Sequence, residues 1–391
     1  MPNYASEKAQ KFTESVIREM TRIAAAHKAV NLAQGFPDFP APDVIKQAAV
    51  EAILADQNQY AITWGAKPLR DSIAWKVQRD YGVEFDPETQ ITVCCGSTEG
   101  MIAALLATVN PGDEVIVFEP YYENYWPDVV LCGATPKFIK LKPPAFDFDR
   151  DELASMFSNR TRAIVFNSPN NPTGKVFSRD ELEFIAGLCI EHNVLAVTDE
   201  IYEHILYDGA VHIPIWTLPG MADRTIAVNS VSKTFSVTGW RIGFVLASSA
   251  ITQSVRKVHD FLTVGTAAPL QAAAARAFRL GSEYYRELAD FYAERRDFLL
   301  NALEDVGFKC VRPQGAYYIM ADITPFGWDD DVAFTRFLTA EIGVAAVPGS
   351  SFFRDGVSDG RHFIRFCFCK RMETLQAAAD RLAKLRGYRK S

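Results

Sequence analysis

The chain has 391 residues, of which 48% are hydrophobic, and this composition is typical of a globular protein. Because a single hydrophobic core stops growing at about 250–300 residues, we expect two lobes. The formal net charge of -7, with both signs interspersed, gives nucleic-acid or membrane binding no electrostatic support. No run approaches about 18 apolar residues and the first residues lack an apolar core, so we expect neither a membrane span nor a signal peptide, and a cytoplasmic protein.

The seven cysteines and six histidines show no metal-binding pattern. Cys94 and Cys95 are adjacent, and Cys367 and Cys369 form a Cys-x-Cys, but no Cys-x-x-Cys occurs. No histidine has a spacing that would complete a tetrahedral zinc site. We therefore expect reduced, buried cysteines and no bound metal.

The N-terminal segment is predicted to be an amphipathic helix followed by a loop. Apolar residues recur at three- and four-residue spacing between residues 5 and 30, as in a helix with one buried face. Residues 31–40 are rich in proline and glycine and should be extended. Gly35 in this loop would let the backbone pass close to a ligand, although a plain connecting turn explains it equally well.

Short apolar runs recur through the first two thirds of the chain, near residues 92, 115, 164, 195, 226 and 243, and helical segments alternate with them. This alternation predicts an α/β fold in which helices cover both faces of a mostly parallel sheet. Elements of this kind should build a large domain over residues 46–275. Residues 1–45 are expected to form an arm that joins the small domain.

From about residue 270 the pattern changes. An alanine-rich helical stretch is followed by a long charged helix over residues 282–305. Strands are then predicted over 315–320 and 363–368. We expect these elements to form a smaller α+β domain over residues 276–391.

Polar residues stand where two of the predicted strands end. Gly96, Ser97 and Thr98 open a helix directly after a strand, so free backbone N–H groups and the helix dipole would attract an anion there. A plain N-cap explains Ser97 or Thr98 equally well. Asp199 ends an apolar run, at the carboxyl edge where open α/β sheets gather their ligands, although it could instead cap a helix.

The stretch from Asn229 to Phe244 places a lysine among hydroxyl groups at a predicted strand end. Lysine condenses with aldehydes, and in a desolvated, cation-rich pocket Lys233 would lose its proton readily enough to be a nucleophile. Ser230 and Arg241 would then bind a phosphate. A cofactor with both an aldehyde and a phosphate, pyridoxal 5′-phosphate, fits this pattern. A lysine without such surroundings would be a surface charge.

With Lys233 in this role, a second function for Asp199 fits better than a helix cap. A carboxylate paired with the pyridine nitrogen keeps that nitrogen protonated, so the ring can absorb the electrons released when the substrate's α-proton leaves. Tyr202, three residues further on, is placed to bond the phenolic oxygen of the cofactor. These three residues are the candidate catalytic groups.

The sequence around Lys233, Ser-x-Ser-Lys-Thr-Phe-Ser-x-x-Gly-Trp-Arg-x-Gly, resembles the cofactor-lysine signature of class I aminotransferases, which are fold-type I pyridoxal phosphate enzymes. The resemblance extends from about Asn31 to Arg365. It implies a large domain with a mostly parallel sheet of the seven-stranded type between helices, and a smaller α+β domain. It also implies a homodimer with active sites at the subunit interface. In this family the lysine holds the cofactor, moves the α-proton as base and acid, and passes the amino group from an amino acid to a 2-oxo acid in a ping-pong cycle.

The resemblance also assigns cofactor ligands. The cofactor phosphate is expected at Ser97 and Thr98. Tyr60, in a Tyr-x-x-x-x-Gly-x-x-x-Leu-Arg stretch, resembles the tyrosine that touches the phosphate in the neighbouring subunit. Tyr122 occupies the position that stacks on the pyridine ring, whereas Tyr125 is expected to be a packing residue.

Three residues are expected at the substrate. Asn171, in Asn-Pro-Thr-Gly, resembles the asparagine that bonds the phenolic oxygen and contributes to holding the substrate carboxylate. Arg365 lies in a predicted strand of aromatic residues and cysteines, where a cation needs an anion. A structural salt bridge would supply one. The family instead uses the similarly placed arginine as a two-pronged clamp on the α-carboxylate. Gly35 is the third substrate residue.

The segment Asn-Leu-Ala-Gln-Gly-Phe-Pro-Asp-Phe-Pro is similar to the branch that contains kynurenine, glutamine and methionine aminotransferases. Phe36, Trp64, Tyr122 and Phe352 around the expected pocket favour a large apolar or aromatic amino acid. Alternatives on the same scaffold are an aspartate aminotransferase and a carbon–sulfur β-lyase. A more distant alternative is a non-catalytic regulator that keeps the cofactor as a ligand, but all predicted catalytic positions are filled.

Overall fold

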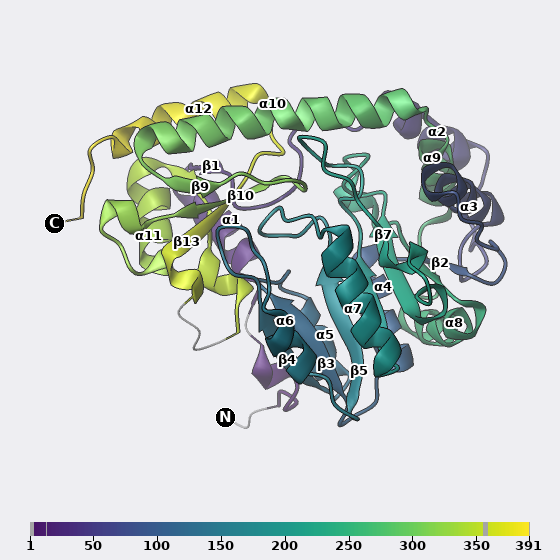
Figure 1. Ribbon diagram of the computed structural model, residues 1–391. Coiled ribbons are helices and arrows are strands. Elements are labelled where there is room, and N and C mark those ends of the chain that lie inside the picture. The colour runs from purple at the N-terminus through teal and green to yellow at the C-terminus, as the bar shows by residue number, and fades with distance from the viewer. Residues whose placement is uncertain (1–3, 13, 355–358, 391) are drawn as a thin grey trace.

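The computed structural model describes residues 4–12, 14–354 and 359–390 (Figure 1). The described chain forms two lobes. In Figure 1 the larger lobe lies at the bottom and right, and the smaller lobe lies at the upper left. The helix α10 (Ser282–Val306) runs along the top of both lobes.

The large lobe is built on a seven-stranded sheet within the described residues. In spatial order its strands are β2 (Ile91–Cys94), β8 (Gly243–Ala247), β7 (Thr225–Ser230), β6 (Leu195–Asp199), β5 (Thr161–Asn167), β3 (Glu114–Glu119) and β4 (Thr135–Lys140). All neighbours pair in parallel except β8, which is antiparallel to both β2 and β7. This confirms the predicted α/β fold with a mostly parallel sheet. The strand β4 was not predicted, because this half-exposed edge strand carries a proline and two lysines and therefore lacks an apolar run.

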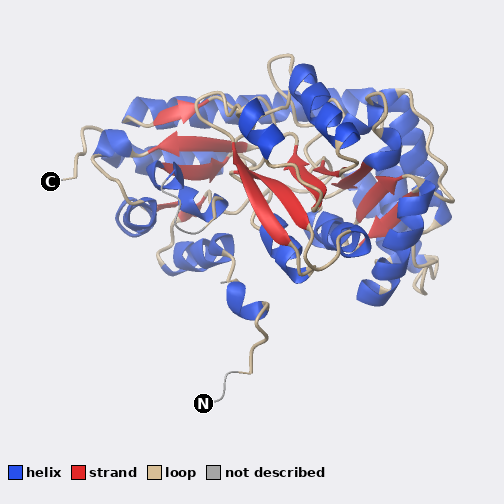
Figure 2. Cartoon of the chain, turned by 60° about the horizontal axis from the view of Figure 1, so that its bottom comes forward, coloured by secondary structure: helices blue, strands red, loops and turns tan. Residues whose placement is uncertain are grey.

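Helices cover both faces of this sheet (Figure 2). They are α2 (Asp43–Leu54), α3 (Lys67–Tyr81), α4 (Gly96–Thr108), α5 (Tyr125–Leu131), α6 (Arg150–Ser155), α7 (Arg179–Glu191), α8 (Ser249–Thr263) and α9 (Ala268–Phe278). In β3, Val115 and Val117 pack with residues of α4, α5 and α8, whereas Ile116 and Phe118 pack with residues of α6 and α7. Successive side chains of a strand point to opposite faces, so the continuous apolar run fills both layers.

The small lobe is an antiparallel sheet covered by helices. Its strands, in spatial order, are β12 (Val347–Pro348), β13 (Phe363–Cys367), β10 (Tyr318–Asp322) and β9 (Lys309–Val311), and its helices are α11 (Asp331–Phe337) and α12 (Met372–Leu382). The N-terminal arm joins this lobe where β1 (Val30–Asn31) pairs in parallel with β11 (Val344–Ala345). The exact domain boundaries stay a prediction.

The helix expected over residues 5–30 is shorter in the structure. α1 (Val16–Ala26) follows Ser15, whose side chain accepts a hydrogen bond from the backbone N–H of Arg18 and so caps the first turn. The helix ends before Lys28, whose φ of 53° lies in the left-handed region. Upstream, Ala9–Lys11 forms only a short 3-10 turn. The apolar spacing correctly predicted a helix here, but the cap at Ser15 and the left-handed residue Lys28 determine where it begins and ends.

The helix α10 connects the cores of the two lobes. At its start, the hydroxyl of Tyr284 donates a hydrogen bond of 2.7 Å to the backbone carbonyl of Thr234 in the large lobe. Further along, Leu299 and Leu303 are buried in the core of the small lobe. One continuous helix therefore reaches from the residue next to Lys233 to the far end of the small lobe.

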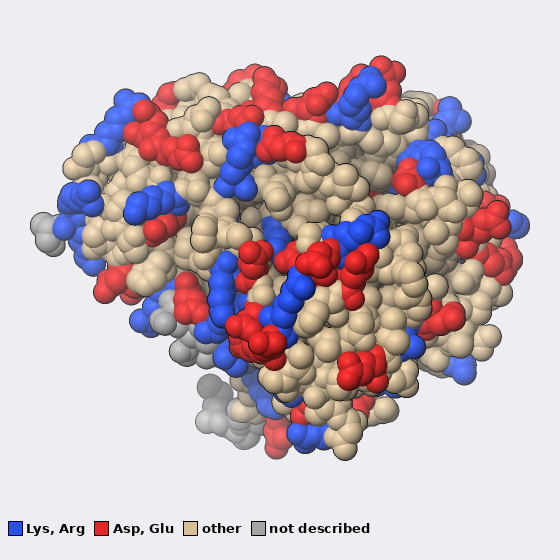
Figure 3. Space-filling view, in the orientation of Figure 1, with Lys and Arg blue, Asp and Glu red and all other residues tan. Residues whose placement is uncertain are grey.

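The distribution of charge on the surface agrees with the interspersed charges of the sequence. The face shown in Figure 3 carries basic side chains beside acidic ones over the described residues. All seven cysteines are unpaired, and they are buried except for Cys95 and Cys310, which are half-buried. Among the described residues, no helix combines the length and apolar character needed to cross a membrane.

Candidate active site

A cavity of about 310 Å³ lies at the carboxyl edge of the central sheet. Because β5, β6 and β7 run in parallel, their last residues reach the same edge. The cavity is lined by Arg18, Ser97, Thr98, Tyr122, Asn167, Asn171, Asp199, Ile201, Tyr202, Ser232, Lys233, Thr238, Arg241 and Tyr318. Both lobes and the helix α1 contribute to it.

Lys233 follows β7 and lies in the cavity with its amine largely removed from water. Its Nζ donates a hydrogen bond of 3.2 Å to the carbonyl oxygen of Gly35, and lies 5.9 and 5.6 Å from the ring centres of Tyr202 and Tyr317. Burial lowers the pKa of Lys233 to about 8. About one tenth of this amine is therefore neutral at pH 7, far more than for a lysine of ordinary pKa, and the neutral form is what a nucleophile and base requires.

Asp199 ends β6 and is a buried residue of the same cavity. One carboxylate oxygen accepts a hydrogen bond of 2.7 Å from the hydroxyl of Tyr125, and the other accepts one of 3.3 Å from the backbone N–H of Ile201. Burial raises the pKa of Asp199 to about 6. Tyr125 packs in the core as expected, and its hydroxyl additionally orients this carboxylate, which was not expected.

The start of α4 and Arg241 form a tight cradle for an anion. A Cβ atom at Gly96 would lie 2.3 Å from Nη2 of Arg241, and one at Gly243 would lie 2.4 Å from the backbone of Gly96. Gly96 also has a φ of +81°. Only glycines at these two positions allow the guanidinium to lie against the helix N-terminus, where Ser97 and Thr98 line the cavity.

Arg365 is fully buried and is held by neutral oxygens. It donates hydrogen bonds of 2.8 Å to Oδ1 of Asn171 and 2.7 Å to the carbonyl of Ala33, while its Nε has no partner among the described residues. Its guanidinium also lies 4.2 Å from the ring centre of Tyr318. No described carboxylate pairs with it, so the structural salt bridge considered above is absent from the described chain. A buried cation without a counterion needs an external anion.

Gly35 has a steric reason to be glycine. A Cβ atom there would lie 2.1 Å from the hydroxyl of Tyr318, which itself lies 3.0 Å from the hydroxyl of Tyr202. The carbonyl of Gly35 accepts hydrogen bonds from Lys233 and, at 2.9 Å, from the hydroxyl of Tyr317. The loop of the N-terminal arm therefore connects the lysine of the large lobe with the tyrosines of the small lobe.

Four predicted site residues do not line the cavity: Gly35, Tyr60, Ser230 and Arg365. Ser230 lies just below it, where its hydroxyl accepts a hydrogen bond of 3.1 Å from the backbone N–H of Ser232. Tyr60 is 90% exposed and borders a separate surface hollow. The other eight predicted residues line the cavity together. Their individual roles stay predictions.

The loop that carries Tyr60 is tied to the start of α4. Glu99 of α4 lies 3.0 Å from Nδ1 of His259, and Nε2 of the same ring lies 2.8 Å from the carbonyl of Thr63. Burial opposes protonation of His259, but the carboxylate of Glu99 outweighs it and raises the pKa of the ring. Cys94 lies close enough to these groups to complete a metal-binding trio. The two hydrogen bonds already engage both ring nitrogens.

Sequence reasoning missed several lining residues. Asn167 ends β5 just as Asp199 ends β6, and its amide donates a hydrogen bond of 2.8 Å to the carbonyl of Asp199. The same signal, a polar residue after an apolar run, could have found it. Tyr318 and Arg18 come from distant parts of the chain and have no local signal. Of the four aromatic residues expected around the substrate, Tyr122 alone lines this cavity.

Comparisons with known proteins agree on one family. A family model described as aminotransferase class I and II matches residues 27–382. The methionine aminotransferase of Escherichia coli (strain K12) is 38% identical, with 95% of this chain and 96% of the relative covered. Kynurenine–oxoglutarate transaminase 1 of Homo sapiens is also 38% identical, with 94% of each chain covered.

A solved structure extends this likeness to three dimensions. The N-succinyldiaminopimelate aminotransferase from Mycobacterium tuberculosis superposes with a TM-score of 0.95 at 39% identity, covering 97% of this chain and 100% of that one. A match of this length and similarity requires the same fold and the same order of elements. The chain is therefore a transaminase and belongs to the class I and II aminotransferase family.

Proposed function

We propose that this transaminase uses pyridoxal 5′-phosphate, held by Lys233, to move the α-amino group of a large apolar or aromatic L-amino acid to a 2-oxo acid. The observation that carries the proposal is the desolvated amine of Lys233, which shares one cavity with Asp199 and the cradle at Arg241. The cytoplasmic location expected from the sequence stays a prediction.

The donor groups in the cavity fit the chemical groups of this cofactor. An aldehyde would meet the amine of Lys233, and a phosphate would meet Ser97, Thr98 and Arg241 where Gly96 leaves room. A protonated ring nitrogen would meet the carboxylate of Asp199. Ser230, Tyr202 and Asn171 would complete the cofactor contacts, and the ring of Tyr122 would stack on the pyridine.

The residues of the chain divide the reaction between them. When bound, the cofactor supplies a ring that accepts the electron pair released from the substrate's Cα–H bond. The Nζ of Lys233 takes the α-proton as a neutral amine and returns it as an ammonium. Asp199 would carry its charge next to the ring nitrogen, because the hydrogen bond from Tyr125 opposes the rise in its pKa that burial causes. Arg365 and Asn171 bind the α-carboxylate, with Gly35 closing the same side of the site.

The cradle gives a direct test of cofactor binding. Replacing Gly96 by alanine should weaken affinity for pyridoxal 5′-phosphate by about tenfold or more, because the new Cβ displaces Arg241 and strains a left-handed residue. Fluorescence titration of the cofactor-free enzyme would measure the change. Gly239→Ala is the matched control, since a Cβ there has nothing within 4 Å. If both variants and the wild type bound the cofactor with equal affinity, the cradle would not be the binding site of the cofactor phosphate.

A homodimer is part of the proposal. Tyr60 and Phe261 are 90% and 92% exposed in the single chain, and Ile62 and Val264 nearby are also exposed. Large apolar side chains that cluster on a surface mark a contact with another protein. A second copy of the chain would cover them, and Tyr60 would then reach the phosphate in the partner's site. Active sites would lie at the subunit interface.

The relatives are named for different amino donors, including N-succinyldiaminopimelate, and two alternatives remain. Proteins named for methionine and for kynurenine match over nearly the whole chain, in keeping with an apolar or aromatic donor. An aspartate aminotransferase remains an alternative, as does a carbon–sulfur β-lyase on the same scaffold. The β-lyase would release pyruvate from cysteine conjugates without any 2-oxo acid acceptor.

The test is a panel of amino donors incubated with a fixed 2-oxo acid acceptor. We expect methionine and aromatic amino acids to be converted to their 2-oxo acids, at least about tenfold faster than aspartate at equal concentration. Chromatography of the 2-oxo acid products would rank the donors. A strong preference for aspartate would contradict the substrate class. Pyruvate formed from cysteine conjugates without an acceptor would favour the β-lyase.

A further inference from the structure

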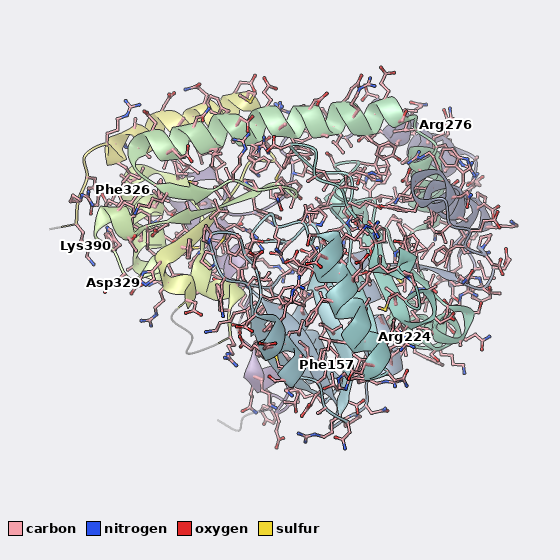
Figure 4. The ribbon with its side chains drawn as sticks, viewed as in Figure 1. Phe157, Arg224, Arg276, Phe326, Asp329 and Lys390 are labelled. Carbon is pink, nitrogen blue, oxygen red and sulfur yellow. The ribbon has the colours of Figure 1, made fainter. Side chains whose placement is uncertain are left out.

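Tyr318 is a tyrosine of the active cavity that the proposed function leaves without a role. It is the first residue of β10 in the small lobe, whereas Tyr202 follows β6 in the large lobe. Phe326, shortly after the end of β10, lies toward the outer side of the small lobe in Figure 4, so the strand runs outward from the cavity. Tyr318 and Tyr202 both line the cavity, and their hydroxyl oxygens lie 3.0 Å apart.

This pair of hydroxyls holds one proton more than the bond between them can use. Burial raises the pKa of both tyrosines, so each hydroxyl keeps its proton near neutral pH. Only one of the two protons can lie between the two oxygens. Within the described residues neither hydroxyl has another hydrogen-bond partner, so the second proton needs a further acceptor. The place for that acceptor is the cavity that both side chains line.

The surroundings of Tyr318 make it the donor of the pair. The guanidinium of Arg365 lies 4.2 Å from the centre of its ring. A cation there makes the phenol a stronger donor, because it stabilises negative charge on the oxygen. Gly35 lies against the same hydroxyl, since a Cβ atom at this glycine would be 2.1 Å away, and this contact restricts where the hydroxyl can point. Tyr202 then accepts the bond from Tyr318 and directs its own proton into the cavity.

The charged and titratable groups around the pair leave this bond undisturbed. Within the part of the chain that the structure describes, none of them forms a hydrogen bond with either hydroxyl. The amine of Lys233 and the hydroxyl of Tyr317 instead donate to the carbonyl of Gly35. The groups that face the pair are Lys233, Asp199, Tyr317, Arg365, Cys367 and Cys369.

We propose that Tyr318 is a positioning residue, which donates a hydrogen bond to the oxygen of Tyr202 and so strengthens the bond from Tyr202 to the phenolic oxygen of the cofactor. This inference rests on the proposed function, because it concerns the same site. Hydrogen bonds in a chain polarise one another, by roughly 10–30% per bond. A stronger donor at the phenolic oxygen stabilises its charged form, and therefore lowers the pKa of the nitrogen that shares a proton with it and joins the cofactor to Lys233.

The experiment titrates the cofactor-loaded enzyme with pH and follows its absorbance. Protonation of the nitrogen between Lys233 and the cofactor changes this absorbance, so the titration gives the pKa of that nitrogen. In Tyr318→Phe the pKa should rise by about half a unit, because one neutral hydrogen bond to Tyr202 is lost. The substitution removes a single oxygen atom and keeps the ring on Arg365.

The variant Tyr202→Phe tests whether Tyr318 acts through Tyr202. This variant should raise the pKa by more than Tyr318→Phe does, because it removes the bond to the phenolic oxygen itself. Adding Tyr318→Phe to it should then cause no further change. A shift of the same size in both backgrounds would mean that Tyr318 acts on the cofactor directly, and would overturn the proposal.

Tyr207→Phe is the matched control. The hydroxyl of Tyr207 is also buried, and it donates a hydrogen bond of 2.6 Å to the carbonyl of Ala316, outside the cavity. Its loss should leave the pKa unchanged, although it costs a similar hydrogen bond. The proposal is overturned if Tyr318→Phe does not shift the pKa, or if Tyr207→Phe shifts it equally. A wild type whose absorbance shows no bound cofactor after pyridoxal 5′-phosphate is added would contradict the proposed function itself.

Discussion

Replacing Lys233 by alanine is expected to abolish transamination, lowering kcat by about 10⁴-fold or more. The substitution removes both the amine that would hold the cofactor and the base that would take the α-proton. No second lysine lines the cavity in the described residues, so nothing there can substitute for it. Product 2-oxo acid, measured by chromatography over hours, would reveal any residual rate.

Lys233→Arg separates the chemistry of this side chain from its charge. A guanidinium keeps the positive charge but stays protonated, so it can act neither as a nucleophile nor as a base near pH 7. We expect the arginine variant to be as inactive as the alanine variant. Borohydride treatment of the wild type with cofactor should fix the cofactor mass on Lys233, and neither variant should gain it. Substantial turnover by either variant would refute the assignment.

Replacing Asp199 by asparagine should lower kcat by about 10²- to 10³-fold while the fold is preserved. Asparagine has nearly the same shape and can still accept a hydrogen bond from Tyr125, but it carries no charge to hold a proton on the ring nitrogen. Steady-state kinetics with a good donor would measure the loss. Thermal unfolding of the variant should stay close to that of the wild type.

Asp128→Asn is the control for this charge. Asp128 is also buried, and burial raises its pKa to about 8, so its carboxyl is largely neutral at pH 7 and the amide should change little. The pKa of Asp199, about 6, adds a second readout. Below pH 6 the carboxyl gains a proton, so cofactor affinity of the wild type should fall there. The cofactor affinity of Asp199→Asn should not fall in this pH range. If it fell as in the wild type, the proposed pairing of Asp199 with the ring nitrogen would be contradicted.

The sequence was sufficient for those parts of the fold and site that have local signals. Apolar runs marked β5, β6 and β7; Asp199 is the last residue of β6, and Lys233 lies three residues after the end of β7. The parallel order of the strands then brings these residues to one edge. Strand β4 was missed for the opposite reason, since an edge strand half exposed to water needs no apolar run.

Other parts of the site depend on contacts that no short stretch encodes. Tyr125 was expected to pack, because nothing in its surroundings indicates a hydrogen bond to a residue 74 positions away. Arg18 lies on α1, where the spacing of apolar residues predicts the buried face of the helix but gives no role to its polar residues. The glycine at position 35 was equally compatible with a plain turn until Tyr318 was found against it. Contacts of this kind form only when the two lobes and the N-terminal arm pack against one another.

The helix α10 restricts how the small lobe can move relative to the large one. With 25 residues at about 1.5 Å per residue, it is a rod of roughly 38 Å. One end is fixed by Tyr284 to the carbonyl of Thr234, and the other is embedded in the small lobe. Because Tyr284 projects from the side of the rod, both a tilt of the rod and a rotation about its own axis would pull on the carbonyl of Thr234, next to Lys233. The rod thus links a movement of the small lobe, which carries Arg365 and Tyr318, to the segment next to Lys233.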